Sequence, residues 1–357
     1  MTYVAGLVRG WRDAGFDDQW ILEGTHGLAA EIRDSLGDLG EVHLTGPSST
    51  WAKIAVQQTT IPMRMLMRKP DVLLCTTPVV PMLTLSTPVV AVVHDLRHLA
   101  RPQDFGGFQN WYREKSWAAG LRRADRLIAD SERTRRDLQE HYPFTQRKVQ
   151  TVYLGSDHVP ALRPGEETGH GIAFARWANK RPDFAIQTWA ALKGLRSDLN
   201  RRLHLVGVDD DEKLILEAMA HDLGIAEFIV IHSFLPEDQF WELFGSAGVV
   251  LFPSFFEGFG LPVLEAMRLG VPVVTWRDPA IVEVAGDCVA YADPSPDGFA
   301  RLAERLLWTD ELRNAQVARA YKRAVGWTWR LTAFQTRSVL VKAAEAARLR
   351  DDLGPQI

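Results

Sequence analysis

The chain has 357 residues, a length at which one hydrophobic core usually gives way to two domains. Hydrophobic residues make up 46% and charged residues 24% of it, with a net charge of -4, which excludes a generally basic protein and predicts no nucleic-acid partner. The most apolar stretch, residues 77–93, is interrupted by three prolines and argues against a membrane span. The cysteines, Cys75 and Cys288, lack metal-like spacing and predict reduced thiols in a cytoplasmic protein.

The first half of the chain alternates helical and strand-like patterns. Val4, Leu7, Val8 and Trp11 have helical spacing, so the chain is expected to open in a helix. Apolar, strand-like runs follow at residues 19–22, 41–45, 71–75, 89–93, 126–129 and 149–154. Such alternation is typical of a parallel sheet with helices on both faces. We therefore predict a doubly wound, Rossmann-like domain over residues 1–155.

A second half of the same kind follows a break in the pattern. Residues 156–171 are rich in proline, glycine and charge, which predicts a linker between domains. Further strands are expected at residues 171–175, 202–206, 228–232, 249–252 and 273–275. We predict a second α/β domain over residues 172–330, with residues 331–357 forming a helix that packs back on the first domain. Two such domains leave a cleft, where ligands commonly bind.

Residues 253–275 hold the most informative pattern, a strand end followed by a glycine loop, a helix and another strand. Pro262 is expected to open the helix, because proline at the first helical position loses no hydrogen bond. The positive end of a helix binds phosphate well. The backbone N–H groups expected to face such an anion are those of Gly258, Phe259, Gly260 and Leu261.

Two carboxylates flank this predicted anion site. Glu257 precedes the glycine loop and Glu265 lies about one turn into the helix. Considered alone, Glu257 is equally well explained as a solvated loop acid, and Glu265 as an acid in the first turn of a helix. Next to a phosphate, however, each needs a partner that carries hydroxyl groups, and the phosphate needs cations. A nucleotide sugar supplies the hydroxyl groups, so the pattern favours a nucleotide-sugar site.

Basic residues follow the strand expected at residues 171–175. Arg176, Lys180 and Arg181 fall on the loop at its carboxyl end, where ligands of doubly wound sheets bind. Arg176 with either Lys180 or Arg181 is expected to neutralise a diphosphate, and the spacing does not choose between the two. A solvated basic loop is the alternative.

The segment over residues 253–275 resembles the E-x7-E region of retaining glycosyltransferases with the GT-B fold, of the type called family 4. The resemblance extends over most of the chain, through His94-Asp95-Leu96, residues 128–138, Leu154-Gly155, residues 174–182, 204–207 and 270–274, and Trp327-Thr328-Trp329. It implies a GT-B enzyme that transfers a sugar from a nucleotide-diphosphate-sugar donor to a glycan, lipid-linked or small-molecule acceptor with retention of configuration. A catalytically silent GT-B protein, acting as an assembly partner or glycan-binding module, is the alternative.

The resemblance also implies roles for single residues. Glu257 is expected near the transferred sugar, as a catalytic residue, and Glu265 near the ribose hydroxyls. His94, at the carboxyl end of a predicted strand, is expected near the sugar, with general catalysis and sugar positioning both open. Asp95 is expected on the acceptor side. The loop around Phe234 is the candidate for contact with the base.

Asp209, Asp210 and Asp211 would suit a divalent cation. They follow a predicted strand and precede the helical pattern of residues 214–219, so we expect them to cap that helix instead. No metal and no cofactor is therefore predicted.

One segment of the first half is enriched in basic residues. Residues 111–148 carry ten Lys or Arg against six Asp or Glu, which indicates either peripheral membrane contact or a solvated helix face.

Similar proteins begin with a strand and a glycine-rich loop before a helix like that of residues 3–15. The first sheet is therefore expected to lack a central strand, either through a misassigned start codon or through genuine loss.

Overall fold

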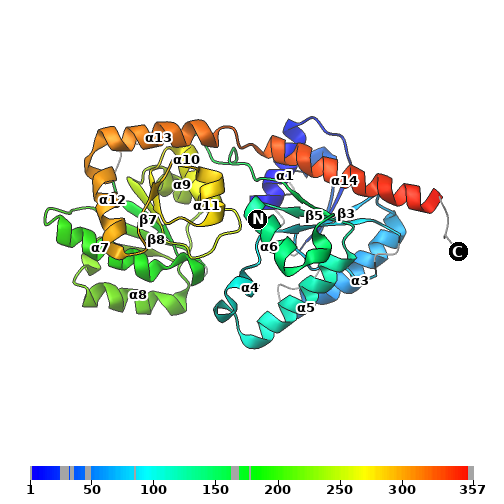
Figure 1. Ribbon diagram of the computed structural model, residues 1–357, viewed down its shortest axis with the longest axis horizontal. Helices are drawn as coiled ribbons and strands as arrows, with labels where there is room; N and C mark the ends of the chain where they lie inside the picture. Colours follow the sequence, from blue (N-terminus) through cyan, green and yellow to red (C-terminus); the bar gives the residue numbers. More distant parts are fainter. Residues whose placement is uncertain are drawn as a thin grey trace. The chain divides into compact units, whose positions relative to one another are not determined.

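The computed structural model describes residues 2–24, 32, 36–44, 50–83, 86–161, 169–176 and 178–352 of the chain. Contacts divide the chain into two compact units, of which unit 1 is Met1–Gly155 with Thr328–Ile357 and unit 2 is Ser156–Trp327 (Figure 1). Each unit is built on parallel β-sheet with helices packed against it, which confirms the predicted α/β fold class. Part of the predicted linker, residues 162–168, lies outside the described residues.

Unit 1 contains two parallel sheets. The larger has the order β3 (Leu73–Cys75), β4 (Val89–Val93), β5 (Arg126–Ala129) and β6 (Val149–Thr151), and the smaller pairs β1 (Trp20–Gly24) with β2 (Gly40–Leu44). All five residues of β4 are buried, and four of them are valines. A continuous run of β-branched residues of this kind suits a strand that is covered on both faces.

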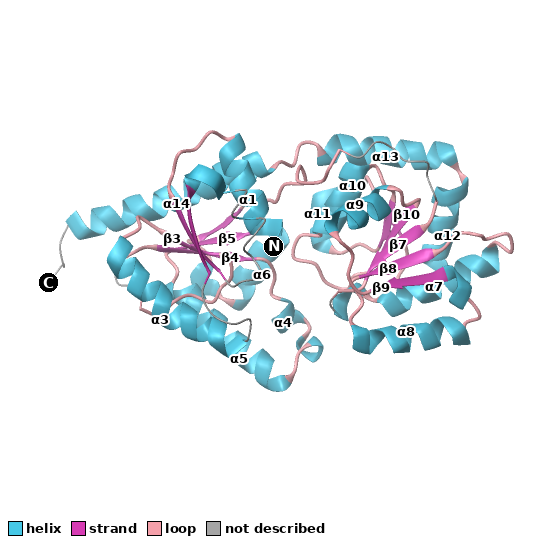
Figure 2. Ribbon diagram, turned by 180° about the vertical axis from the view of Figure 1, so that it is seen from behind, coloured by secondary structure: helices cyan, strands magenta, loops and turns pink. Residues whose placement is uncertain are grey.

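Helices cover both faces of the larger sheet. α1 (Thr2–Asp13) and α14 (Trp329–Asp352) pack on the face that carries Val90 and Val92. α5 (Gly107–Arg123) and α6 (Glu132–His141) pack on the opposite face, through Leu121 and Leu138. The described part of unit 1 also contains the helices α3 (Thr50–Arg68) and the short α4 (Arg97–Ala100). Figure 2 shows these helices around the strands.

The contact between α1 and α14 depends on two glycines. A Cβ atom at Gly10 would lie 2.0 Å from the carbonyl oxygen of Trp329, and one at Gly6 would lie 2.1 Å from its indole ring. Trp329 itself is completely buried. A side chain at either position would therefore push the two helices apart, which explains why α1 carries glycines inside a helix despite their low helix propensity.

Unit 2 contains one parallel sheet of six strands in the order β12-β11-β10-β7-β8-β9. The strands are β7 (Gly171–Phe174), β8 (Leu203–Val206), β9 (Ile229–His232), β10 (Val249–Phe252), β11 (Val273–Thr275) and β12 (Ala290–Tyr291). Read from β9, this is the 3-2-1-4-5-6 order of doubly wound folds, in which the chain changes direction between the first and fourth strands. The switch point of unit 2 therefore lies between β7 and β10.

Helices again cover both faces in unit 2. α7 (Pro182–Leu195), α8 (Asp210–Asp222) and α12 (Pro296–Trp308) share one core with the sheet. α9 (Glu237–Gly245) packs on the other face, where Phe240 and Phe244 contact Phe174 of β7. α10 (Leu261–Leu269) contacts α9, α11 (Pro279–Ala285) and α13 (Asp310–Ala324).

The predicted strands over residues 89–93, 126–129, 249–252 and 273–275 match the structure residue for residue, and the others differ at their ends. Two details of the predicted helix starts are wrong. Pro262 is the second residue of α10, because Leu261 is the first. Asp209 takes the cap position of α8, but its side chain accepts no capping hydrogen bond there, so the aspartates support α8 only by their charge at its positive end.

Candidate active site

Two loops meet at the switch point of the unit 2 sheet. One follows β7 and carries the predicted basic residues, and the other follows β10 and carries the glycines. β7 and β10 are hydrogen-bonded neighbours, so both loops leave the same edge of the sheet. The backbone N–H of Phe255 donates to the carbonyl oxygen of Asn179 at 3.0 Å and ties the loops together. Doubly wound folds bind their ligands at this place.

Helix α10 begins at the end of the second loop. Gly260 occupies its cap with φ 88°, a left-handed conformation that favours glycine. Phe259 is buried, with its ring 5.8 Å from that of Trp327. The helix follows the loop at the carboxyl end of β10, so its positive end lies at the edge of the sheet that holds the switch point. That the backbone N–H groups of Gly258 to Leu261 bind a phosphate stays a prediction.

Glu257 lies in a buried polar cluster formed by both loops. Its side chain is 10% exposed, and its Oε1 accepts a hydrogen bond from Lys180 Nζ at 2.7 Å and one from Asn179 Nδ2 at 3.2 Å. Asn179 also donates to Ser254 Oγ at 2.9 Å. The ammonium group of Lys180 lies 4.4 Å from the centre of the Phe252 ring. A buried ion pair costs desolvation energy, so its retention here points to a use of both charges.

The structure distinguishes Lys180 from Arg181, between which the sequence could not choose. Arg181 is turned away from Glu257, because its guanidinium binds both carboxylate oxygens of Asp183 and lies 4.5 Å from the centre of the Phe255 ring. Its backbone has φ 53° at the cap of α7. Arg176 is exposed beyond the carboxyl end of β7. Lys180 is therefore the cation that accompanies Glu257, while the phosphate-binding role of all three remains a prediction.

Glu265 is paired with a residue that sequence reasoning missed. Its Oε1 lies 2.9 Å from Nε2 of His158, and the two side chains are 10% and 14% exposed. The ring of His158 contacts Trp241 edge to face at 5.9 Å. His158 lies in the predicted linker, and no motif marks it. Its contact holds the carboxylate of Glu265 at the first turns of α10.

In unit 1, His94 follows the carboxyl end of β4, as predicted. Its Nδ1 lies 2.5 Å from Oδ2 of the buried Asp130, and its Nε2 lies 3.1 Å from the carbonyl oxygen of Thr76. Both neighbours are acceptors, so the ring satisfies both only when each nitrogen carries a proton. Burial lowers the pKa of His94, but the charge and hydrogen bond of Asp130, together with Asp95 and the Thr76 carbonyl, outweigh it, so the pKa is raised. The geometry favours positioning over general-base catalysis.

Asp95 and Phe234 lie apart from these clusters. Oδ1 of Asp95 accepts a hydrogen bond from the backbone N–H of Arg97 at 2.8 Å, which supports the start of α4. Phe234 is 84% exposed after β9, and β8 separates β9 from β7. The structure does not join Phe234 to the cluster at the switch point. Its role, and that of Asp95, remain predictions.

Asn179 and Asp278 are further residues that sequence reasoning missed. Asp278 caps α11, accepting from the N–H of Ala280 at 2.8 Å, and its other oxygen lies 3.4 Å from the N–H of Glu257. The pair Asp278-Pro279 is a recognisable helix start and could have been found. Asn179 carries no such signal, because its importance depends on how the two loops meet.

Comparisons with known proteins place the chain in a family. The model described as "Glycosyltransferase Family 4" matches residues 2–159, and the model described as "Glycosyl transferases group 1" matches residues 175–323. Between them they match most of both units. The chain therefore belongs to the GT-B glycosyltransferases of family 4, as its resemblance implied.

Individual relatives are distant. The chain is 26% identical to O-antigen chain mannosyltransferase B of Escherichia coli, over 69% of this chain and 68% of that protein. It is 30% identical to a D-inositol 3-phosphate glycosyltransferase of Frankia alni, over 58% of this chain and 56% of that protein. The matched stretch thus spans only about half of this second relative. Anabaena Alr3699/HepE in complex with UDP and glucose has the same fold, with TM-score 0.75, 16% identity and coverage of 95% of this chain and 96% of that one.

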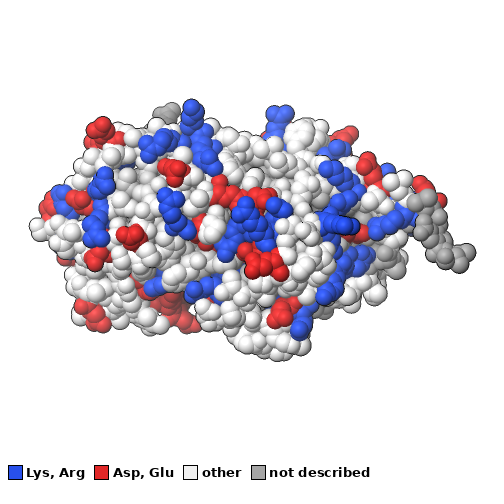
Figure 3. Space-filling model, viewed as in Figure 1, with Lys and Arg blue, Asp and Glu red and all other residues white. Residues whose placement is uncertain are grey.

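In the described ranges, no group of three or more His, Cys, Asp and Glu is arranged to hold a metal ion, and no helix is long and apolar enough to cross a bilayer. Figure 3 shows acidic and basic side chains intermingled over the visible face. Near the start of α5, Phe108 and Trp111 are 64% and 55% exposed and stack on each other. Membrane contact at this segment remains a prediction.

Proposed function

We propose that the chain transfers a sugar from a nucleotide-diphosphate-sugar donor to an acceptor, with retention of configuration and without a metal. The observation that carries the proposal is the buried pair of Glu257 and Lys180 beside the start of α10, at the switch point of the unit 2 sheet. An acid, a cation and a helix dipole at one sheet edge suit a ligand that carries both a sugar and a diphosphate.

The donor would lie along the carboxyl edge of the sheet. Lys180, together with Arg176, would neutralise the diphosphate, and the start of α10 would bind it through backbone N–H groups. Glu265, held by His158, would accept hydrogen bonds from the ribose hydroxyls. Solved structures of the same fold hold UDP, among them the Anabaena protein, which supports a nucleoside diphosphate as the ligand class.

During transfer, the bond between the anomeric carbon and the phosphate oxygen breaks, and negative charge grows on the leaving diphosphate. An acceptor hydroxyl oxygen bonds to the same face of that carbon, and its proton passes to the leaving diphosphate. Lys180 and the helix dipole would stabilise that charge, so no metal is needed. Positive charge grows on the sugar ring, and the carboxylate of Glu257 would stabilise it. Lys180 is paired with Glu257 in the structure and would turn toward the diphosphate once the donor is bound.

The proposed acceptor class and location rest on the names of relatives and on two exposed aromatic side chains. The names of the relatives mention an O-antigen chain and inositol 3-phosphate, so a glycan, a lipid-linked glycan or a small polyol phosphate suits the acceptor class. We propose a cytoplasmic enzyme in which the exposed Phe108 and Trp111 support peripheral contact with a membrane.

The donor site is tested by calorimetric titration of the full chain with UDP, GDP, ADP and dTDP, first in EDTA and then with magnesium. We expect one nucleotide to bind in EDTA and magnesium to change its affinity little. Replacing Lys180 by alanine should weaken binding by roughly 10- to 100-fold, the worth of a hydrogen bond to a charged group. Lys213→Ala on the exposed surface of α8 is the matched control and should leave the affinity unchanged.

Two results of this titration would overturn the assignment. Absence of binding for all four nucleotides, with and without magnesium, would favour a silent GT-B protein. Equal affinities for the wild type and the Lys180 variant would place the diphosphate away from the switch point.

A further inference from the structure

The contact between His158 and Glu265 joins two segments of unit 2 that are far apart in the sequence. Nε2 of His158 lies 2.9 Å from Oε1 of Glu265, the fifth residue of α10. A carboxylate only accepts hydrogen bonds, so Nε2 carries a proton and donates it. This contact uses one of the roughly four acceptor positions of the carboxylate, so the others can receive hydroxyl groups of a ligand.

The backbone on each side of His158 is anchored. Ser156 is completely buried, its N–H donates to the carbonyl oxygen of Trp327 at 2.9 Å, and its hydroxyl donates to that of Ala324 at 3.2 Å. Val159 is also buried, and its N–H donates to the carbonyl oxygen of Ser156 at 3.2 Å. The imidazole therefore extends from a turn that is fixed at both ends.

Trp241 of α9 limits the movement of the imidazole ring. The two rings meet edge to face, with their centres 5.9 Å apart. Trp241 is itself buried, and its indole N–H donates to Oε1 of Glu237 at 3.1 Å. An aromatic contact and a hydrogen bond to a carboxylate together leave the ring of His158 little freedom to turn.

Glu265 has a neighbouring cation on its own helix. Arg268 follows it by three residues in α10, and residues three apart on a helix are neighbours. Nη1 of Arg268 is buried and has no hydrogen-bond partner in the described part of the chain. Glu265 pairs instead with His158. Without the imidazole, the carboxylate would be drawn toward Arg268 and away from its present direction.

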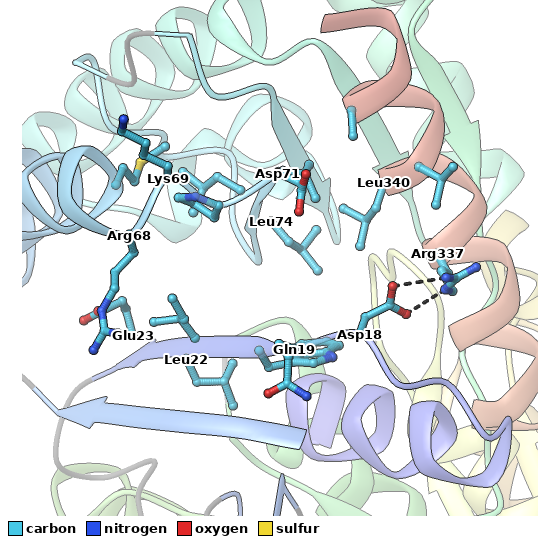
Figure 4. Close-up of a pocket in the computed structure, with 18 of the residues that line it drawn as sticks. Asp18, Gln19, Leu22, Glu23, Arg68, Lys69, Asp71, Leu74, Arg337 and Leu340 are labelled. Atoms are coloured by element: carbon cyan, nitrogen blue, oxygen red, sulfur yellow. Dashed lines mark hydrogen bonds and ion pairs between the residues drawn. The ribbon is translucent and has the colours of Figure 1, made fainter. Parts of the chain in front are cut away.

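An ion pair elsewhere in the chain shows the difference that burial makes. Asp18 and Arg337 lie at the wall of a cavity of about 700 Å³ in unit 1, and Figure 4 shows their two contacts. Both side chains are more than one third exposed, and a solvated pair of this kind contributes little. His158 and Glu265 are far less exposed, so their contact fixes the direction of the carboxylate.

We propose that His158 is a positioning residue that makes the donor site selective for ribonucleotides over 2′-deoxyribonucleotides. The inference rests on the proposed function, in which Glu265 accepts the ribose hydroxyl groups. The two hydroxyls of ribose need two acceptor positions of defined direction, and 2′-deoxyribose fills only one. By holding Glu265, His158 presents both positions before the donor binds, so no side chain has to be ordered on binding. Among UDP, GDP, ADP and dTDP, only dTDP lacks the 2′-hydroxyl, so the donor base is expected to be one of the other three.

Calorimetric titration of the full chain with UDP, GDP and ADP, each beside its 2′-deoxy form, tests the inference. For the base that binds, the wild type should hold the ribonucleotide roughly 10- to 100-fold more tightly, the range for a hydrogen bond to a charged group. His158→Phe keeps an aromatic ring beside Trp241 but loses the donor, and it should bring this ratio within about threefold by weakening the ribonucleotide. His158→Ala should give the same loss.

Three further variants separate positioning from a structural defect. His158→Gln keeps an N–H donor and should hold the ratio above about fivefold. In a Glu265→Gln background, His158→Phe should change the ratio no further, because both residues act through one carboxylate. His221→Phe is the matched control, since His221 is 85% exposed on α8 and should keep the wild-type ratio. A general structural defect would weaken both forms of the nucleotide alike and would leave the ratio unchanged.

The possible failures are distinguishable. A ribonucleotide that binds with the same ratio in the wild type and in the His158→Phe and His158→Ala variants would overturn this inference and leave the donor site standing. Equal affinities of the wild type for the two forms would do the same. Absence of binding by every nucleotide would overturn the proposed function, and this inference with it.

Discussion

Replacing Glu257 by glutamine is expected to lower the turnover of the donor by roughly 100- to 1,000-fold, the usual cost of removing one preorganised charge from a transition state. The amide keeps the size of the side chain but cannot stabilise positive charge on the sugar ring. Affinity for the nucleoside diphosphate should stay within about twofold, or improve, because Lys180 loses its anionic partner and turns more readily to phosphate. Release of nucleoside diphosphate and calorimetric titration measure the two effects.

Glu217→Gln is the matched control, since that glutamate lies on the exposed surface of α8 with a side chain 49% exposed. It should alter neither turnover nor affinity. Circular dichroism checks that the Glu257 variant folds, because the change leaves Lys180 without its buried partner. A folded Glu257 variant with wild-type turnover would show that this carboxylate does not act on the sugar.

Acid is expected to destabilise unit 1 between about pH 6.5 and 4 because of His98. This residue is fully buried, and neither ring nitrogen has a hydrogen-bond partner in the described part of the chain. Burial, aided by Arg113, lowers the pKa of His98 from 6.5 to about 4. The folded state keeps the ring neutral while the unfolded state takes up a proton below pH 6.5. Stability is therefore complete above pH 6.5 and falls by up to about 3 kcal/mol as the pH approaches 4.

Phenylalanine at position 98 should remove most of this pH dependence, because it fills the site beside Trp117 without a titrating group. Amide exchange of α5 at pH 7.5, 6.5, 5.5 and 4.5 reports on unit 1 alone. His221→Phe is the control, since His221 is 85% exposed and should leave the slope unchanged. In unit 2, burial lowers the pKa of His204 to about 4, so that unit should remain acid-sensitive in both variants. An unchanged slope for α5 in the His98 variant would refute the assignment.

The sequence predicts the sheets well where the signal is local. The runs of β4 and β10 are continuous, apolar and rich in valine, and they are bounded by glycine, proline or a polar residue, so their ends match the structure. β12 was not predicted, because a strand of two residues is too short to show a repeating hydrophobic pattern. The expected lack of a central strand in the first sheet stays a prediction.

Single residues of the candidate site were predicted from the sequence, but the contacts between them were not. Gly260 and Pro262 mark the start of α10 because backbone conformation and helix chemistry require them there. The choice between Lys180 and Arg181 could not be made, because it depends on the left-handed backbone of Arg181 and on its pairing with Asp183. The contact of His158 with Glu265 joins residues 107 positions apart, which no local pattern reveals.

The most direct test of the central claim is an assay of transfer itself. The chain is mixed, in EDTA, with UDP-, GDP-, ADP- or dTDP-linked sugars and methanol as a small acceptor, which traps the product against mutarotation. Proton NMR of the anomeric hydrogen then reports its configuration. We expect one donor to yield a methyl glycoside that keeps the donor's configuration, and Glu257→Gln to form at least 100-fold less of it. A product of inverted configuration, or no release of nucleoside diphosphate from any donor, would contradict the account.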